Sequence, residues 1–259
     1  MFLATMIGNS LIVGITAIDS ALHTPMYYFL KNLALTEICY SLSIVPKMLL
    51  ILLGERKIIS FTACALQLSC AILFVTCECF LLGVMAYDRQ VAICHPLHYG
   101  TMMNRDLCFK MADHFFCDVS PVLNLVCADT ALFELLIFMA TVMIVMIPFS
   151  LIIISYLLII HAVLQIPSAV GQRQAFSTCA AHLVVVTFFY STTGIIHLRP
   201  KSSLSSNMKK MVSLSYTVVT PMINPFIYSL RNQKVKQSLR ECINKRLLRK
   251  QMIFSLSSS

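Results

Sequence analysis

The sequence has few charged residues and no tryptophan. Asp, Glu, Lys and Arg make up only 12% of its 259 residues, whereas soluble domains usually contain about 25%. The glycine- and histidine-based motifs of nucleotide-binding proteins, zinc proteases and serine hydrolases are also missing, so nothing points to an enzyme or a cofactor. This composition excludes a disordered chain, a coiled coil and an ordinary water-soluble fold.

Apolar residues dominate instead, at 58% of the chain. A helix that crosses a bilayer needs about 20 mostly apolar residues. Six segments meet or nearly meet this length, and none shows the alternation of a membrane barrel. They are residues 1–18, 26–53, 61–87, 131–160, 175–198 and 211–230. The pattern predicts an all-α membrane protein with a helical bundle over residues 1–230 and a tail over 231–259.

The positive charge is concentrated near the carboxyl terminus. Of the net +9, the stretch from Arg231 to Lys250 contributes eight basic residues against one acid. Short basic segments favour the cytoplasmic side, so we expect the tail there, near anionic lipid rather than nucleic acid. The stretch after Tyr87 is also basic. Both assignments together require a crossing between Arg89 and Ala131, where no apolar run is long enough.

Two acids lie near the middle of expected spans, Glu37 in the second and Glu78 in the third. Ionisable groups inside a membrane are costly and usually functional. If the two carboxyl groups face each other, they can share a proton or hold a cation. The alternative is a pair of protonated acids hydrogen-bonded into the bundle. Asp88 and Arg89 end the third span, either as a local ion pair or as an interfacial anchor.

Prolines interrupt otherwise apolar helices at Pro148, Pro221 and Pro225. Proline removes a backbone hydrogen bond and kinks a helix, which can create hinges and cavities. Asn224 places a polar side chain beside the carbonyls that such a kink frees.

The eleven cysteines contain no C-x-x-C pair, so a zinc site is not expected. Cys179 has His182 three residues later, but no acid is placed to orient the histidine for nucleophilic catalysis. On the outer side, where oxidation is permitted, Cys64, Cys117 and Cys127 are candidates for a disulfide.

Taken together, several motifs resemble those of the odorant receptor family of rhodopsin-like G-protein-coupled receptors. Gly8-Asn9, Ser155-Tyr156 and His182 fit the same family. The longer motifs are residues 22–30 (LHTPMYYFL), 85–97 (MAYDRQVAICHPL), 175–179 (AFSTC) and 221–232 (PMINPFIYSLRN). The resemblance covers roughly residues 1–250. It implies a seven-transmembrane receptor-like helical bundle, here reduced to six clear spans.

The resemblance also implies roles for single residues. Arg89, with Asp88 beside it, is the group expected to turn toward a G protein, and Tyr156 and Tyr228 are its aromatic partners. Asn224 and Pro225 belong to the seventh-helix motif of activation. Glu37 and Glu78 fall on two acidic positions that the family places face to face, which favours a cation or proton site. Cys64 and Cys117 match the disulfide between the third helix and an outer loop.

The implied function is binding of a small volatile odorant, followed by activation of a stimulatory heterotrimeric G protein that raises cyclic AMP. We expect a multi-pass protein of the plasma membrane without cofactor or certain metal. The expected pocket residues are Ala71, Ile72, Val75, Ala140, Ile144, Tyr190, Thr193 and His197. The alternative is a truncated, non-signalling membrane protein, either retained in the endoplasmic reticulum or paired with intact receptors.

The chain departs from the family in its length. The fourth helix and the first part of the outer loop are absent between Ala112 and Asp113, and the first helix begins late. Two topologies follow. Either the amino terminus is cytoplasmic and the first three helices are inverted, or those helices stay upright and residues 111–130 return through the bundle.

Overall fold

The computed structural model describes residues 1–52, 60–103, 130–197, 219–231 and 234–241. Within these ranges every regular element is helical, and none is a strand. The long apolar runs form helices because a helix pairs nearly all its backbone N–H and C=O groups within one segment. This confirms the predicted all-α fold.

Six longer helices carry the described part of the chain. They are α1 (Phe2–Ile18), α2 (Pro25–Leu52), α3 (Phe61–Cys94), α7 (Thr130–Leu164), α8 (Ala169–His197) and α10 (Thr220–Arg231). Short helices follow α1 and α3, namely η1 (Ser20–Leu22), η2 (Pro96–His98) and α4 (Tyr99–Met102), and residues 234–241 are also helical. Four helices, α2, α3, α7 and α8, are long and apolar enough to cross a membrane, while α1 is apolar but shorter.

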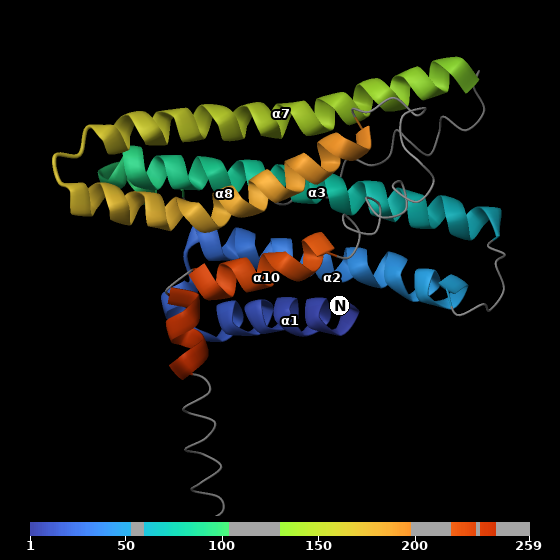
Figure 1. Cartoon of the computed structure of the whole chain (residues 1–259), viewed down its shortest axis with the longest axis horizontal. Helices are drawn as coiled ribbons and strands as arrows, with labels where there is room; N and C mark the ends of the chain where they lie inside the picture. Colours follow the sequence, from blue (N-terminus) through green and yellow to red (C-terminus); the bar gives the residue numbers. More distant parts are fainter. Residues whose placement is uncertain (53–59, 104–129, 198–218, 232–233, 242–259) are drawn as a thin grey trace, which may run out of the picture.

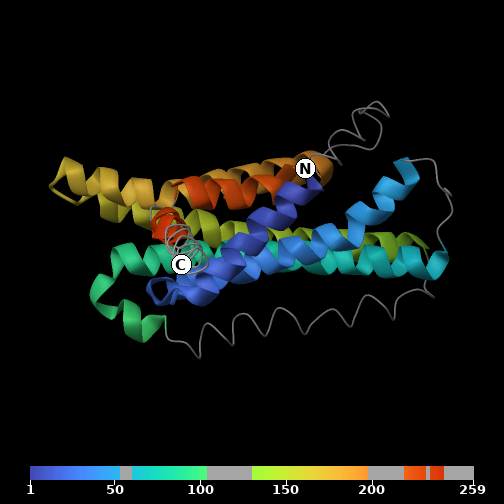
Figure 2. The ribbon, with the colours of Figure 1, turned by 90° about the horizontal axis from the view of Figure 1, so that it is seen from below.

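The helices form a bundle whose members run mainly along its long axis (Figures 1 and 2). At one edge α7 packs against α3 and α8, and at the opposite edge α1 packs against α2 and α10 (Figure 1). Helices α3 and α2 are in contact, as are α8 and α10. The interior is therefore lined by α2, α3, α8 and α10, and the largest fully buried side chains include Phe29, Phe189 and Tyr228.

The outer face of α7 is strongly apolar. Met143, Ile147, Ile154 and Leu157 are all more than half exposed. In water such a surface favours association and aggregation, whereas the hydrocarbon core of a bilayer solvates it well. The side chains on this face therefore suit a helix that contacts lipid.

Helices α3 and α7 run in the same direction. Contacts between them advance along both helices together, as parallel packing requires. The contacting pairs are Gly83 with Pro148, Gln90 with Ser155, and Cys94 with Leu158. The end of α4 near Met103 and the start of α7 at Thr130 consequently lie at opposite ends of the bundle (Figure 1). Of the two topologies considered above, this arrangement corresponds to the one with the first three helices upright.

Helix ends do not coincide with the ends of the apolar runs. Helix α3 begins after Ser60, whose side chain accepts a hydrogen bond from the Ala63 backbone N–H at 3.2 Å. It continues past Tyr87 to Cys94, and α8 already begins at Ala169. Charged residues end the apolar run, but they have adequate helix propensity and do not end the helix.

The prolines occupy different positions in their helices. Pro148 lies inside α7 and Pro225 inside α10, as expected, and Pro46 lies inside α2. Pro221 is the second residue of α10. Its carbonyl accepts a hydrogen bond from the Asn9 side chain at 3.2 Å, which ties α10 to α1.

Candidate functional site

A buried polar cluster, formed by Asn9, Glu37, Glu78 and Asn224, joins four helices in the interior. Glu37 is 1% exposed and Glu78 is 5% exposed. The Asn224 amide donates a hydrogen bond to Glu37 Oε1, the Asn9 amide donates to the Pro221 carbonyl at the start of α10, and the two carboxyl groups interact electrostatically. Glu37 and Glu78 are thus both buried in the same part of the bundle, and their role as a shared proton or cation site stays a prediction.

This cluster holds oxygen atoms that accept no hydrogen bond from the described residues. They are Glu37 Oε2, Glu78 Oε1 and Asn224 Oδ1. A buried acceptor without a partner costs about 1–3 kcal/mol, so a shared proton or a cation would be stabilised here. Carboxylate and amide oxygens are suitable ligands for hard cations. Among the described residues no three His, Cys, Asp or Glu side chains gather as a metal site, and the cation role stays a prediction.

Asp88 and Arg89 lie near the end of α3. Asp88 is buried, and its Oδ1 accepts a hydrogen bond from the Tyr99 hydroxyl of α4 at 2.7 Å. Arg89 is half-buried, and its Nε has no hydrogen-bond partner among the described residues. Both residues contribute to one cavity, and the Asp88 carboxylate also joins α3 to α4.

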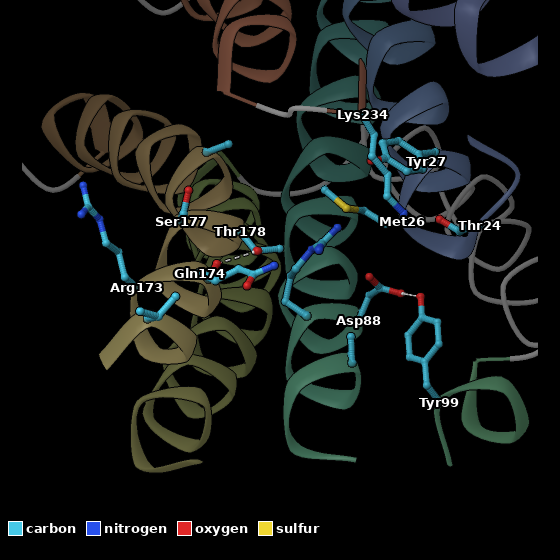
Figure 3. A pocket seen from close by; sticks show the side chains of 14 residues that line it. Thr24, Met26, Tyr27, Asp88, Tyr99, Arg173, Gln174, Ser177, Thr178 and Lys234 are labelled. Carbon is cyan, nitrogen blue, oxygen red and sulfur yellow. Dashed lines mark hydrogen bonds between the residues drawn. The ribbon is translucent and has the colours of Figure 1, made fainter. Parts of the chain in front are cut away.

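That cavity, called the Arg89 cavity below, has a volume of about 690 Å³. It opens between the start of α2, the end of α3, the start of α8 and the helix beginning at Lys234 (Figure 3). Its lining residues are Thr24, Met26, Tyr27, Asp88, Arg89, Ala92, Tyr99, Val170, Arg173, Gln174, Ser177, Thr178, Ala181 and Lys234. Elements that are distant in sequence therefore meet around Arg89.

A hydrogen-bonded chain above this cavity links α7, α8 and α3. His182 of α8 is fully buried; its Nε2 lies 3.1 Å from the Leu82 carbonyl oxygen, and its Nδ1 lies 2.7 Å from the Tyr156 hydroxyl. A carbonyl only accepts, so Nε2 carries the proton, and a neutral ring then accepts from Tyr156 at Nδ1. Tyr228 of α10 is also buried, and its hydroxyl has no hydrogen-bond partner among the described residues.

The residues expected to bind a ligand lie further along the same helices. Ala71, Ile72, Val75 and Ile144 are partly buried on α3 and α7. The Tyr190 ring lies 5.0 Å from that of Phe149. The Tyr190 and Thr193 hydroxyls are buried without a hydrogen-bond partner among the described residues, so each can bind a polar ligand group. Ala140 belongs to α7 and His197 ends α8, but the structure describes only the backbone of these two residues.

Only one of the two cysteines of the expected disulfide, Cys64, belongs to the described residues. Cys64 is exposed in the first turn of α3. Cys117 lies outside the described residues, so the pairing stays a prediction.

Sequence reasoning missed three contacts of this region. The hydrogen bonds from Tyr99 to Asp88, from Asn9 to Pro221 and between His182 and Leu82 join residues far apart in sequence or on separate elements. A polar residue inside an apolar run is a signal that it has a partner, and Asn9 and His182 both show it. The identity of the partner, however, is set by helix packing.

Comparison with known proteins settles the family. The family model described as Olfactory receptor matches residues 1–113 and 105–250, which together include most of the chain. The chain belongs to the olfactory receptor family. It is thus a rhodopsin-like G-protein-coupled receptor and a multi-pass membrane protein, and it is not an enzyme.

Individual relatives match nearly the whole chain. Human Olfactory receptor 10A7 is 47% identical over 283 aligned residues, which cover 98% of this chain and 90% of that protein. Human Olfactory receptor 10A5 is 48% identical, with 95% and 86% covered, and mouse Olfactory receptor 8U3 is 43% identical with the same coverage. The 283-residue alignment is longer than the 259-residue chain, so 10A7 contains residues inside the aligned region that this olfactory receptor lacks.

Proposed function

We propose that this olfactory receptor binds a small volatile odorant and activates a stimulatory heterotrimeric G protein. The observation that carries the proposal is the Arg89 cavity, in which a half-buried arginine meets the ends of α2, α3 and α8. Such a cavity can receive a segment of another protein at one end of the bundle. The basic residues around it favour a cytoplasmic position for this end under the charge rule for membrane proteins.

The odorant site of this proposal lies between α3, α7 and α8, around Val75, Ile144, Tyr190 and Thr193. Largely apolar walls with a few polar groups suit small volatile molecules. The unpartnered hydroxyls of Tyr190 and Thr193 favour ligands with a hydrogen-bond acceptor or donor. Ala71, Ile72, Ala140 and His197 extend the site on the same helices.

Activation in this proposal is a shift between two arrangements of the bundle. A ligand that binds one arrangement more tightly shifts the population toward it. The contacts that must rearrange are those of Tyr156 with His182 and of His182 with Leu82, because they fix α8 against α7 and α3. Tyr228, Asn224 and Pro225 complete the set on α10. A cation or proton at Glu37 and Glu78 would stabilise the arrangement in which the buried polar cluster is closed.

The test is a cyclic AMP assay in cells that express the chain at the plasma membrane, with a panel of volatile compounds. We expect at least one compound to raise cyclic AMP and Arg89→Ala to abolish the response. Lys31→Ala is the matched control, because it removes a positive charge from α2 outside the Arg89 cavity. Surface labelling in the same cells shows how much protein reaches the plasma membrane.

Two results contradict the proposal. One is a response that survives Arg89→Ala at equal surface level. The other is a chain that stays in the endoplasmic reticulum and gives no response to any compound, which is the outcome expected for a truncated, non-signalling protein.

A further inference from the structure

The Arg89 cavity has an excess of positive charge. Arg89, Arg173 and Lys234 line it, and Asp88 is the one acid among its described lining residues. The Asp88 carboxylate accepts the Tyr99 hydroxyl and keeps its negative charge, so the described lining has three cations against one acid. The three positive charges come from α3, α8 and the helix after α10, so they are spread over the walls rather than stacked at one point.

Neutral hydrogen-bonding groups and an apolar wall complete the lining. In Figure 3, Gln174 and Thr178 lie on the side of α8 that faces α3, and Lys234 approaches from the opposite wall near Met26 and Tyr27. Arg173 stands at the rim and points away from α3. The volume of about 690 Å³ falls within the range of about 300–1,000 Å³ that is usual for small-molecule sites.

We propose that the Arg89 cavity binds a phosphate-bearing polyol, supplied as the headgroup of a phosphorylated inositol lipid or as the soluble inositol phosphate. A phosphate monoester carries a charge of about −1.5 to −2 at neutral pH and three acceptor oxygens. A ligand with several phosphates therefore matches dispersed cations better than a single carboxylate does. Arg89 and Lys234 bind phosphate oxygens from two walls, and the Gln174 amide and Ser177 hydroxyl donate from α8.

The location of the cavity supports this ligand class. The orientation proposed above places the cavity at the cytoplasmic edge of the bilayer, where negatively charged lipid headgroups attract clustered basic side chains. The inference rests on that orientation and on no other part of the proposed function. A bound ligand would join α3, α8 and the helix that begins at Lys234 through one anion and would compete with a G protein for Arg89.

The experiment measures binding of a fluorescent inositol trisphosphate to the full-length chain in phosphatidylcholine nanodiscs, without odorant or G protein. We expect saturable binding, and we expect Lys234→Ala to weaken it about tenfold, as loss of a charge-assisted hydrogen bond does. Gln174→Lys should tighten binding, a gain that misfolding cannot produce. Arg240→Ala is the matched control, because Arg240 is an exposed cation outside the cavity.

A second arm distinguishes the two sources of the phosphate group. Nanodiscs that contain phosphatidylinositol bisphosphate should bind less of the soluble probe if the lipid headgroup enters the cavity, and equal binding assigns the site to the soluble ligand alone. The inference is overturned if the wild-type chain shows no saturable binding. It is also overturned if Arg240→Ala weakens binding as much as Lys234→Ala, or if Gln174→Lys gives no gain. Loss of the cyclic AMP response alone leaves it standing, so the two proposals fail separately.

Discussion

Asn224 shows how one side chain joins two helices of the bundle. Its amide donates to Glu37 Oε1, and both residues are buried. Asn224→Ala leaves a buried carboxylate with one donor fewer, so we expect the free energy of unfolding to fall by about 1–3 kcal/mol. Thermal unfolding in lipid-detergent micelles measures the change. Asn32→Ala is the control, because Asn32 binds a carbonyl of its own helix, and an equal loss there would contradict the argument.

The pair of Tyr156 and His182 should behave as one unit. The Tyr156 hydroxyl lies 2.7 Å from His182 Nδ1, so removing either group leaves the other unpaired in the interior. Tyr156→Phe and His182→Ala should therefore be non-additive, with an interaction energy of about 0.5–3 kcal/mol in a double-mutant cycle. Tyr156→Phe combined with Thr16→Val is the reference cycle, since Thr16 bonds within α1, and its effects should add. Additivity in the first cycle would show that the hydrogen bond is not formed in solution.

The packing of α3 on α7 depends on a small residue. A Cβ atom at Gly83 would lie 3.2 Å from Pro148 Cβ and 3.5 Å from its Cα, and the proline ring cannot rotate away. Gly83→Val should push the two helices apart and lower the melting temperature, since overpacking typically costs about 1–3 kcal/mol. Gly14→Val in α1 is the matched control, because nothing lies within 4 Å of its Cβ position. Similar melting temperatures for the two variants would argue against the close approach.

At the level of elements, hydropathy predicts where helices exist but not where they end. The apolar run ending at Tyr87 gave the right position for the third helix, because about 20 apolar residues have few other stable states in a membrane. Helix α3 continues to Cys94, since Asp88 finds Tyr99 as a partner and Arg89 opens onto the cavity. Partners on other elements decide such extensions, and a single sequence contains no direct record of them.

For the candidate site, the sequence likewise indicates some residues but not the contacts between segments. Glu37 and Glu78 could be paired because two acids in apolar runs are costly alone. The Arg89 cavity could not be predicted, because it needs Lys234, Gln174 and Thr24 from three separate segments. Their meeting depends on how α2, α8 and the last helix pack against α3.

For the whole molecule, the parallel course of α3 and α7 fixes which ends share a side of the membrane. The starts of α3 and α7 lie at one end of the bundle, and the end of α3 and the start of α8, which contribute residues to the Arg89 cavity, lie at the other (Figure 1). Residues 104–129, which connect α4 to α7 in sequence, lie outside the described residues, and no apolar run in their sequence is as long as an ordinary span. Among the described residues, α3 and α7 therefore present their amino-terminal ends to the same side.

This arrangement predicts the outcome of glycosylation mapping. Acceptor sites inserted at the amino terminus and near Ser120 should both be modified in microsomes, because both precede helices that start at the outer end. A site inserted after Ser168, in the turn between α7 and α8, should stay unmodified and serves as the control. If the first three helices were inverted, the amino-terminal site would stay unmodified while the Ser120 site was used. That pattern would separate the two topologies, because a span over residues 104–129 is needed only when α3 and α7 are parallel.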